Sequence, residues 1–187
     1  MERLDTRLDG PMLLKPKVFG DDRGFFAETY RRSVFADLGI PEEMKQDNNS
    51  RSAGKIVRGM HFQIGEGTAK LVRCGRGAIY DVVVDLRKGS PTFGQWEGFE
   101  LTDENGRMLY VPVGFAHGFC VLSDIADVFY KQDRYYADAT ERGIKYDDPA
   151  VGVQWPLPVA ELKPSERDAN APTLAEIEPD LPFVYSG

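Results

Sequence analysis

The sequence predicts an all-β protein, a jelly roll of two sheets with a few short peripheral helices. Short runs rich in β-branched and aromatic residues alternate with turns marked by glycine, proline, asparagine and aspartate along most of the chain. Helical periodicity, by contrast, is scarce. Many short strands at regular spacing indicate an antiparallel sandwich or barrel, and a double-sheet jelly roll fits these runs.

The helical candidate comes early in the chain. Residues 31–38 have helical spacing, with Gly39 as the stop signal and Pro41 just beyond it. Predicted strands, each bounded by a turn signal, cover residues 55–62, 70–73, 78–86, 98–101, 108–111 and 126–133. The turn Asp103-Glu104-Asn105-Gly106 predicts a hairpin between two of them.

Length and composition predict the domain organisation. The chain has 187 residues, 42% of them hydrophobic, which favours a single domain over residues 1–187. The tail, about 150–187, is rich in proline and acidic residues and is expected to wrap the barrel as loops and short helical turns. No apolar run approaches the roughly 20 residues of a membrane span, and the first residues lack a signal-peptide pattern, so we expect a cytoplasmic protein.

Charge and cysteine content narrow the function classes. A formal charge of −7 argues against a protein that binds a nucleic-acid backbone. Basic residues nevertheless crowd the middle third of the chain: Lys55, Arg58, Lys70, Arg73, Arg76, Arg87 and Lys88. They indicate either a site for a small anionic ligand or solvated charges at strand edges. Cys74 and Cys120 have neither disulfide-framework nor zinc-type spacing, so buried reduced thiols are expected.

The chain contains only two histidines, His61 and His117, each in an apolar frame with glycine. Imidazole exchanges protons readily near neutral pH, because its unperturbed pKa is about 6.5. Strand alternation predicts that His61 shares a face with Gly59, which leaves room for a ligand. The opposite face would carry Arg58, Met60 and Phe62. Without further motifs, a histidine in such a strand would be read as a core residue.

A jelly roll with two histidines also invites comparison with metal sites. His117 follows Pro112 and Gly114, where a barrel strand begins, 56 positions after His61 (117 − 61). Neither histidine has another at i+2, as a His-x-His metal site would require. Two imidazoles from different strands and one carboxylate remain an alternative. The favoured prediction is a site without a metal or other cofactor.

Several short motifs follow one another along the chain. They are Phe19-Gly20-Asp21-Asp22-Arg23-Gly24-Phe25-Phe26, Gln46-Asp47-Asn48-Asn49-Ser50, Arg58-Gly59-Met60-His61-Phe62-Gln63, Lys70-Leu71-Val72-Arg73, Asp81-Val82-Val83-Val84-Asp85-Leu86-Arg87, Ser90-Pro91-Thr92-Phe93-Gly94, Pro112-Val113-Gly114-Phe115-Ala116-His117-Gly118-Phe119 and Tyr130-Lys131. Their order and spacing resemble the dTDP-4-dehydrorhamnose 3,5-epimerase family, from about Leu13 to about Leu174. Each motif alone is weak, but so many in register form a strong signal.

The resemblance implies a cupin jelly roll (double-stranded β-helix) that forms a homodimer and needs no metal. It also implies the substrate, a dTDP-linked 4-keto-6-deoxy sugar that is epimerised at C3 and C5. The C4 carbonyl makes the protons on C3 and C5 acidic, because the resulting carbanion is stabilised as an enolate. A base is then needed on one face of the ring and an acid on the other.

By position in the family motifs, four residues are implied in catalysis. His61 is the base, and Asp168 orients its ring and stabilises the imidazolium. Tyr130 is the acid on the opposite face. Lys70 lies near the C4 oxygen, where a cation stabilises the enolate. Without the resemblance, Asp168 would be read as a solvated charge and Tyr130 as a core aromatic.

The resemblance also implies the substrate contacts. His117 contacts the substrate in the same region, and Tyr136 stacks on thymine. The diphosphate contacts are Arg23, Arg58 and Arg167, the last standing where many relatives carry lysine. Further nucleotide-sugar contacts are Glu28, Gln46, Asp47, Asn48 and Glu141. The pair Phe25-Phe26 belongs, in relatives, to an N-terminal strand that is exchanged between subunits.

Two other functions remain open from the sequence. Relatives from antibiotic-sugar pathways act at C3 only or at C5 only and can keep the same residues. A metal-dependent or non-enzymatic cupin could share the barrel, since a fold alone does not determine function. The joint presence of His61, Asp168 and Tyr130 favours the enzyme, because a sugar-binding module needs no acid and base on opposite faces.

Overall fold

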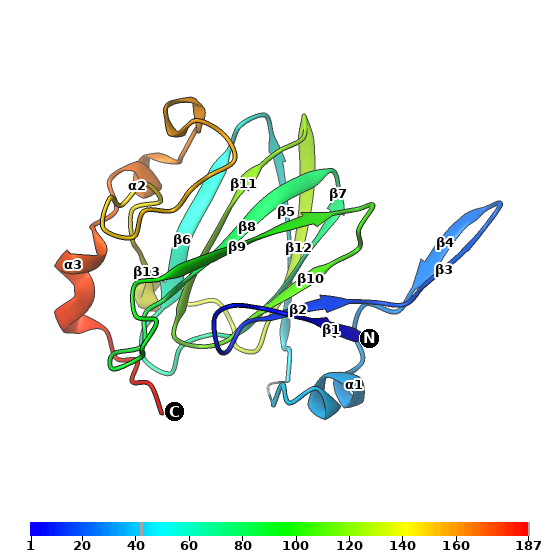
Figure 1. The fold of residues 1–187 in the computed structure, drawn as a ribbon, viewed down its shortest axis with the longest axis horizontal. Coiled ribbons are helices and arrows are strands. Elements are labelled where there is room, and N and C mark those ends of the chain that lie inside the picture. The colour runs from blue at the N-terminus through cyan, green and yellow to red at the C-terminus, as the bar shows by residue number, and fades with distance from the viewer. Residues whose placement is uncertain (42, 187) are drawn as a thin grey trace.

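Two antiparallel sheets form the body of the molecule (Figure 1), and the computed structural model describes residues 1–41 and 43–186. The six-stranded sheet has the order β1 (Glu2–Leu4), β2 (Met12–Lys15), β10 (Met108–Val111), β7 (Lys70–Arg76), β12 (Ile125–Gln132) and β5 (Gln46–Ala53). The five-stranded sheet has the order β13 (Glu141–Gly143), β6 (Val57–Gln63), β11 (Phe115–Val121), β8 (Ala78–Asp85) and β9 (Trp96–Thr102). This architecture confirms the predicted all-β jelly roll.

The helices are short and lie at the periphery. They are α1 (Arg32–Asp37), α2 (Glu166–Ala169) and α3 (Leu174–Ile177), with 3-10 turns at Asp138–Thr140, Val159–Glu161 and Glu178–Asp180. Helix α1 matches the predicted helix to within a residue at each end. The predicted strands also occur, with their ends shifted by up to three residues. Strand β5 has no β-branched or aromatic residue and escapes prediction, and β11 is buried at every position, so it lacks the alternation that marks a strand.

The apolar core has two main layers. One lies between the sheets and contains residues from both, including Val72, Val83 and Phe119. The other lies between the five-stranded sheet and the C-terminal segment, residues 144–183, which contributes Trp155 and Phe183 among others. Burying each such large side chain contributes about 1.5–3 kcal/mol. The C-terminal segment is therefore fixed to the sheet by packing, and it carries α2 to the edge of β6.

A β-bulge interrupts the pairing of β6 with β11. His61 lies opposite His117, whereas Arg58 lies opposite Phe119, so the spacing of three residues on β6 matches two on β11. The extra residue reverses the alternation of β6. The prediction that Arg58 and His61 occupy opposite faces is therefore wrong, because both side chains line the same cavity.

A hairpin of β3 (Val18–Asp21) and β4 (Gly24–Ala27) extends away from the sheets (Figure 1). Its aromatic side chains are exposed, Phe25 to 71% and Phe26 to 68%. Exposed aromatics gathered on one short element mark an interaction surface. The hairpin therefore has the character of a segment that packs against another molecule.

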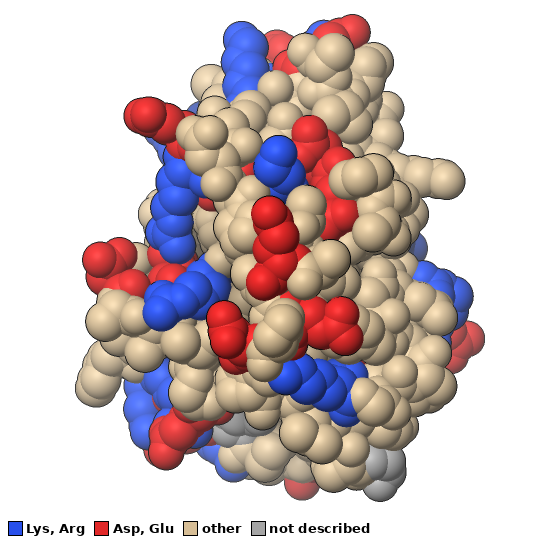
Figure 2. Space-filling view, turned by 90° about the vertical axis from the view of Figure 1, so that its left-hand side faces the viewer, with Lys and Arg blue, Asp and Glu red and all other residues tan. Residues whose placement is uncertain are grey.

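Surface charge and thiols complete the description. Figure 2 shows the side formed by the C-terminal segment, where acidic and basic side chains are interspersed and form no continuous basic surface. Cys74 and Cys120 are free and buried, and burial raises the pKa of each thiol to about 11. Within the described ranges, no helix has the length and apolar character needed to cross a membrane.

Strands β6 and β11 approach each other closely at Gly59. A Cβ added there would lie 2.5 Å from Gly118 Cα, and φ is +124°. We predict that Gly59→Ala lowers the free energy of unfolding by about 2–6 kcal/mol, the sum of backbone strain and overpacking. Gly65 has φ +78° and open space around its added Cβ, so Gly65→Ala should cost only about 1–2 kcal/mol. Equal losses in urea unfolding would contradict the packing argument.

Candidate active site

A cavity of about 450 Å³ opens between the two sheets. Strands β6 and β11 form one wall, β5, β7 and β12 form the other, and residues 163–168 border it. Its lining includes most of the residues that the family resemblance implies: Arg58, His61, Lys70, His117, Tyr130, Tyr136, Glu141, Arg167 and Asp168. The structure thus places all four implied catalytic side chains in one cavity.

The imidazole of His61 is held by a buried carboxylate from the C-terminal segment. Asp168 is 4% exposed, and its Oδ1 lies 2.7 Å from His61 Nε2. The backbone N–H of Gly59 donates to Asp168 Oδ2 at 3.2 Å. Ser165 caps α2 by accepting a hydrogen bond from the Asp168 amide at 3.1 Å. The cap and the two partners of the carboxylate together determine where Asp168 lies.

These contacts determine the ionisation of Asp168 and the tautomer of its partner. Burial disfavours the charged carboxylate, but the hydrogen bond and charge of His61 and the Gly59 N–H outweigh it, so the pKa of Asp168 lies below its ordinary value. A carboxylate on Nε2 keeps the hydrogen of neutral His61 on that nitrogen. The lone pair is then on Nδ1, which makes Nδ1 the basic atom of this side chain.

A second imidazole–carboxylate pair lies beside the first. His117 Nε2 is 2.6 Å from Oδ1 of Asp81, a side chain with no exposed surface. The other oxygen, Asp81 Oδ2, is the one buried side-chain nitrogen or oxygen atom without a hydrogen-bond partner in the described part of the chain. Sequence analysis did not identify Asp81 as a site residue. Asp81 could have been recognised as the single carboxylate within the apolar strand 79–84. The alternation of that strand would have placed its side chain in the core, where a carboxylate needs a partner.

Lys70 and Tyr130 face the histidines from the six-stranded sheet. Burial lowers the pKa of the Lys70 ammonium, and the negative charges of Glu141 and Asp81 oppose this shift. Burial also raises the pKa of the Tyr130 phenol, as does the charge of Glu141. Tyr130 therefore keeps its proton at neutral pH, and Lys70 is a desolvated amine close to two carboxylates.

A charged network lies at the mouth of the cavity. The Tyr136 hydroxyl is 3.0 Å from a Glu141 oxygen, and this hydrogen bond is the main reason that the pKa of Tyr136 rises to about 12. Arg167 forms an ion pair with the same carboxylate. Arg58 donates from Nε to a serine hydroxyl of β5 at 2.9 Å. Lys163, which no motif indicated, is an exposed third cation in the lining.

The polar residues of β5 divide between two faces. Gln46 and Asn48 share a face of β5 with Ser50, which lines the cavity, and hydrogen-bond to Gln132, a cavity-lining residue that sequence analysis did not identify. Asp47 lies on the opposite face, where it forms an ion pair with Lys131 at 2.7 Å and lines a separate hollow of about 300 Å³. Asn48 borders the same hollow, and none of these three predicted contacts lines the cavity itself.

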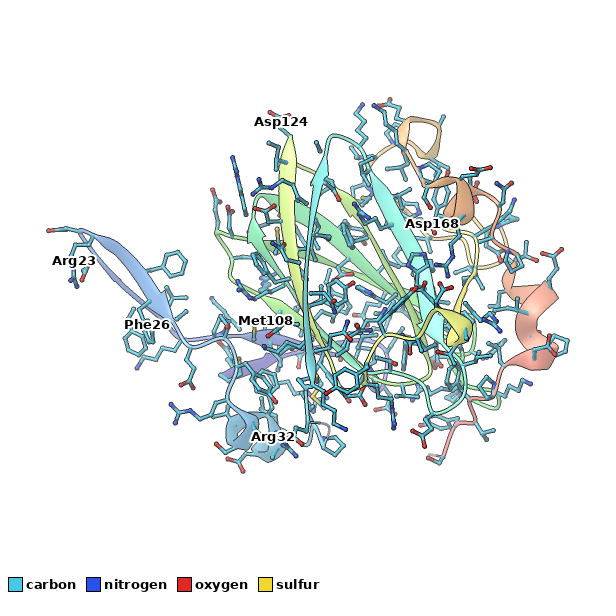
Figure 3. All side chains as sticks on the ribbon, turned by 180° about the vertical axis from the view of Figure 1, so that it is seen from behind. Arg23, Phe26, Arg32, Met108, Asp124 and Asp168 are labelled. Carbon is cyan, nitrogen blue, oxygen red and sulfur yellow. The ribbon has the colours of Figure 1, made fainter. Side chains whose placement is uncertain are left out.

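Two predicted contacts lie outside the cavity altogether. Arg23 is at the tip of the hairpin, paired with Asp21, and Figure 3 shows it at the far end of the molecule from Asp168. Glu28 follows β4 and pairs with Arg31. Neither residue lines the cavity of its own chain. Within the described residues, no group of three or more His, Cys, Asp or Glu side chains is arranged to hold a metal ion.

The cavity combines an imidazole paired with a carboxylate, a phenol and a desolvated amine around a space for a small polar ligand, with cations at its mouth. A cupin-type jelly roll with these groups is an acid–base site. The chain belongs to the dTDP-4-dehydrorhamnose 3,5-epimerase family, whose sequence profile matches residues 5–176. This confirms the resemblance of the motifs.

Known members of this family are similar to the chain over nearly its whole length. The dTDP-4-dehydrorhamnose 3,5-epimerase of Salmonella typhimurium is 48% identical over 174 residues, covering 91% of this chain and 94% of the relative. A 3,5-epimerase of Legionella pneumophila, solved in complex with dTDP-4-keto-L-rhamnose, superposes with a TM-score of 0.95 at 42% identity, covering 100% and 99% of the two chains. A dTDP-4-dehydrorhamnose 3-epimerase of Streptomyces niveus is 42% identical, covering 87% and 79%.

The lowered pKa of Asp168 predicts a pH-dependent contribution to stability. Because the folded pKa is depressed, the stabilisation is present above the unfolded value of about 3.9 and is lost as the pH falls through the folded value. The difference in unfolding free energy between wild type and Asp168→Asn should therefore shrink as the pH falls from 5 to 3, measured by urea unfolding. Glu104→Gln, at an exposed loop position, serves as the control. A difference that stays constant over this range would contradict the assignment.

Proposed function

We propose that this protein converts dTDP-4-dehydro-6-deoxy-glucose to dTDP-4-dehydrorhamnose by epimerising C3 and C5 through enolate intermediates, and that it does so in the cytoplasm. The observation that carries the proposal is the convergence of His61, Lys70, Tyr130 and Asp168 on one cavity. The relatives that share this family are named for the same reaction. Free buried thiols are consistent with a reducing compartment.

The first step is removal of a proton from the carbon next to the C4 carbonyl. His61 Nδ1 takes this proton, and the imidazolium that forms is stabilised by Asp168 on the other ring nitrogen. The negative charge moves to the C4 oxygen as the C–H bond breaks. Lys70 stabilises that charge, and a donor of this kind is typically worth about 2.7–4 kcal/mol of the barrier.

The second step returns a proton to the opposite face. Tyr130 is placed on the sheet across the cavity from His61, and its raised pKa keeps the phenol protonated and available as an acid. Inversion requires that acid and base lie on different sides of the ring. The two walls of the cavity supply this separation.

Action at one carbon is the second candidate. The 42% identical relative from Streptomyces niveus is named a 3-epimerase, so the family contains single-site enzymes. Label from heavy water distinguishes the candidates, because each carbon that loses its proton acquires deuterium. Label at C3 and C5 supports the double epimerase, whereas label at one carbon only supports the single-site enzyme.

Removal of the base should abolish turnover while leaving binding nearly intact. We predict that His61→Asn lowers kcat at least 100-fold, the lower end of general-base contributions, with little change in affinity for dTDP. Proton NMR of the substrate in heavy water measures exchange at both carbons, and circular dichroism checks the fold. A folded variant that keeps more than about a hundredth of the wild-type rate would exclude His61 as the base.

A homodimer with exchanged hairpins forms part of the proposal. The exposed aromatics of the β3–β4 hairpin support it, as does the position of Arg23 and Glu28 outside the cavity of their own chain. In an exchanged dimer, the hairpin of one subunit would carry Arg23 to the cavity of the other. A guanidinium suits a diphosphate, because it forms paired hydrogen bonds to phosphate oxygens.

Co-expression of two inactive variants tests this arrangement. Arg23→Ala and His61→Asn should complement each other, because one site of the mixed dimer receives both wild-type residues. About a quarter of wild-type activity is expected, from one intact site in half of the dimers. Arg58→Ala with His61→Asn is the matched control and should not complement, since both residues line the same cavity of one chain. Failure of the first pair to complement would exclude exchange of Arg23.

A further inference from the structure

Gln132 is a polar side chain in the cavity to which the proposed mechanism gives no role. It ends β12, is 3% exposed and lines the cavity. In the sheet it lies directly opposite Lys70 on one side and Gln46 on the other. Residues paired in this way share a face, as do residues two apart on one strand, so Gln132 lies beside both Lys70 and Tyr130.

A row of side-chain amides connects Gln132 to the backbone of Tyr136. The Tyr136 N–H donates to Gln46 Oε1 at 2.9 Å. A backbone N–H can only donate, so the oxygen of Gln46 must face it. The Gln46 amide nitrogen consequently faces the other way, where it donates to Asn48 Oδ1 at 2.9 Å.

The same reasoning continues to the end of the row. Because the Asn48 oxygen accepts from Gln46, its nitrogen is free to donate, and it does so to Gln132 Oε1 at 3.0 Å. The oxygen of Gln132 is thus used by the row. The backbone N–H of Tyr136 thus determines the orientation of all three side-chain amides in the row. The orientation of the Gln132 amide follows from this network of hydrogen bonds.

The Gln132 amide nitrogen is left pointing away from the row. It has no hydrogen-bond acceptor among the described residues, although the rest of the side chain is buried. It is not sealed in the core, because Asp81 Oδ2 is the one sealed and unpartnered side-chain atom there. The Nε2 of Gln132 therefore reaches the space of the cavity, where it is available to donate a hydrogen bond to a ligand.

We propose that Gln132 Nε2 donates a hydrogen bond to the C4 oxygen of the sugar, beside the ammonium of Lys70. The inference rests on the proposed function. A sugar hydroxyl both donates and accepts, so it would be served by either orientation of the amide. A carbonyl or enolate oxygen only accepts, and it is the group for which a donor of fixed orientation matters. This bond strengthens as the oxygen becomes charged, so it acts on kcat.

Two variants of Gln132 and one control test the proposal. Gln132→Glu keeps the shape and the acceptor for Asn48 but replaces the donor with a charge, whereas Gln132→Met removes both the donor and the acceptor for Asn48 without adding charge. Gln154→Glu makes the same charge change at an exposed position outside the cavity. We expect kcat to fall about 100-fold or more for Gln132→Glu and at least about 10-fold for Gln132→Met. The control should match wild type.

Binding of dTDP distinguishes a contact to the C4 oxygen from a merely structural role of Gln132. A structural defect would weaken dTDP binding together with kcat, whereas loss of the C4 contact would lower kcat alone. This ligand lacks the C4 oxygen, so its affinity should stay within about threefold of wild type in both variants, measured by calorimetry. A folded Gln132 variant with wild-type kcat would overturn the proposal, and so would a loss of dTDP affinity that parallels the loss of kcat. If Gln132→Glu does not fold, Gln132→Met decides.

Exchange by the wild-type protein separates this inference from the proposed function. If wild type introduces deuterium at neither C3 nor C5, both proposals fail together. If wild type exchanges and the variants exchange equally fast, only the role of Gln132 is refuted.

Discussion

The site depends on one buried carboxylate. Asp168 is held between its own helix cap and β6, and it is in turn what holds the imidazole of His61. A buried charge is stable only where hydrogen-bond donors surround it. Strand β6 supplies two such donors to the Asp168 carboxylate, and the carboxylate in turn orients the His61 side chain of that strand. Gly59 contributes to this arrangement in two ways. Its N–H binds Asp168, and its missing side chain lets β11 approach, which brings His117 opposite His61.

The two imidazole–carboxylate pairs are alike in connectivity but differ in environment. The His61 side chain is 26% exposed and its carboxylate comes from the C-terminal segment, whereas the His117 side chain is 9% exposed and its carboxylate is sealed within β8. The base of the proposed mechanism must meet the ligand and accept a proton, which suits the more open side chain of His61. The closed pair places negative charge near Lys70, where it opposes the effect of burial on the ammonium.

The sequence predicted the sheets better than it predicted the site. Alternation and turn signals identified six of the thirteen strands of the described residues, because a half-buried strand alternates between apolar and polar residues. They missed β5, which lacks β-branched and aromatic residues, among other strands. They placed Arg58 wrongly because strict alternation does not allow for a bulge, although a glycine within a strand, here Gly59, often marks one. The histidines could be selected by their chemistry alone. Asp168 could not, since only its distant contacts distinguish it from a solvated charge, and only the family motif indicated it.

His61 and Asp168 are 107 residues apart in the chain, whereas His117 and Asp81 are 36 apart. Closing a long loop costs conformational entropy that only the packing of the intervening chain can offset. Both members of the inner pair lie on strands of the five-stranded sheet, whereas Asp168 comes from the C-terminal segment that packs against it. Unless this segment is docked, His61 lacks the carboxylate partner of its imidazole. The complete site thus requires the outer layer of the molecule as well as its β framework.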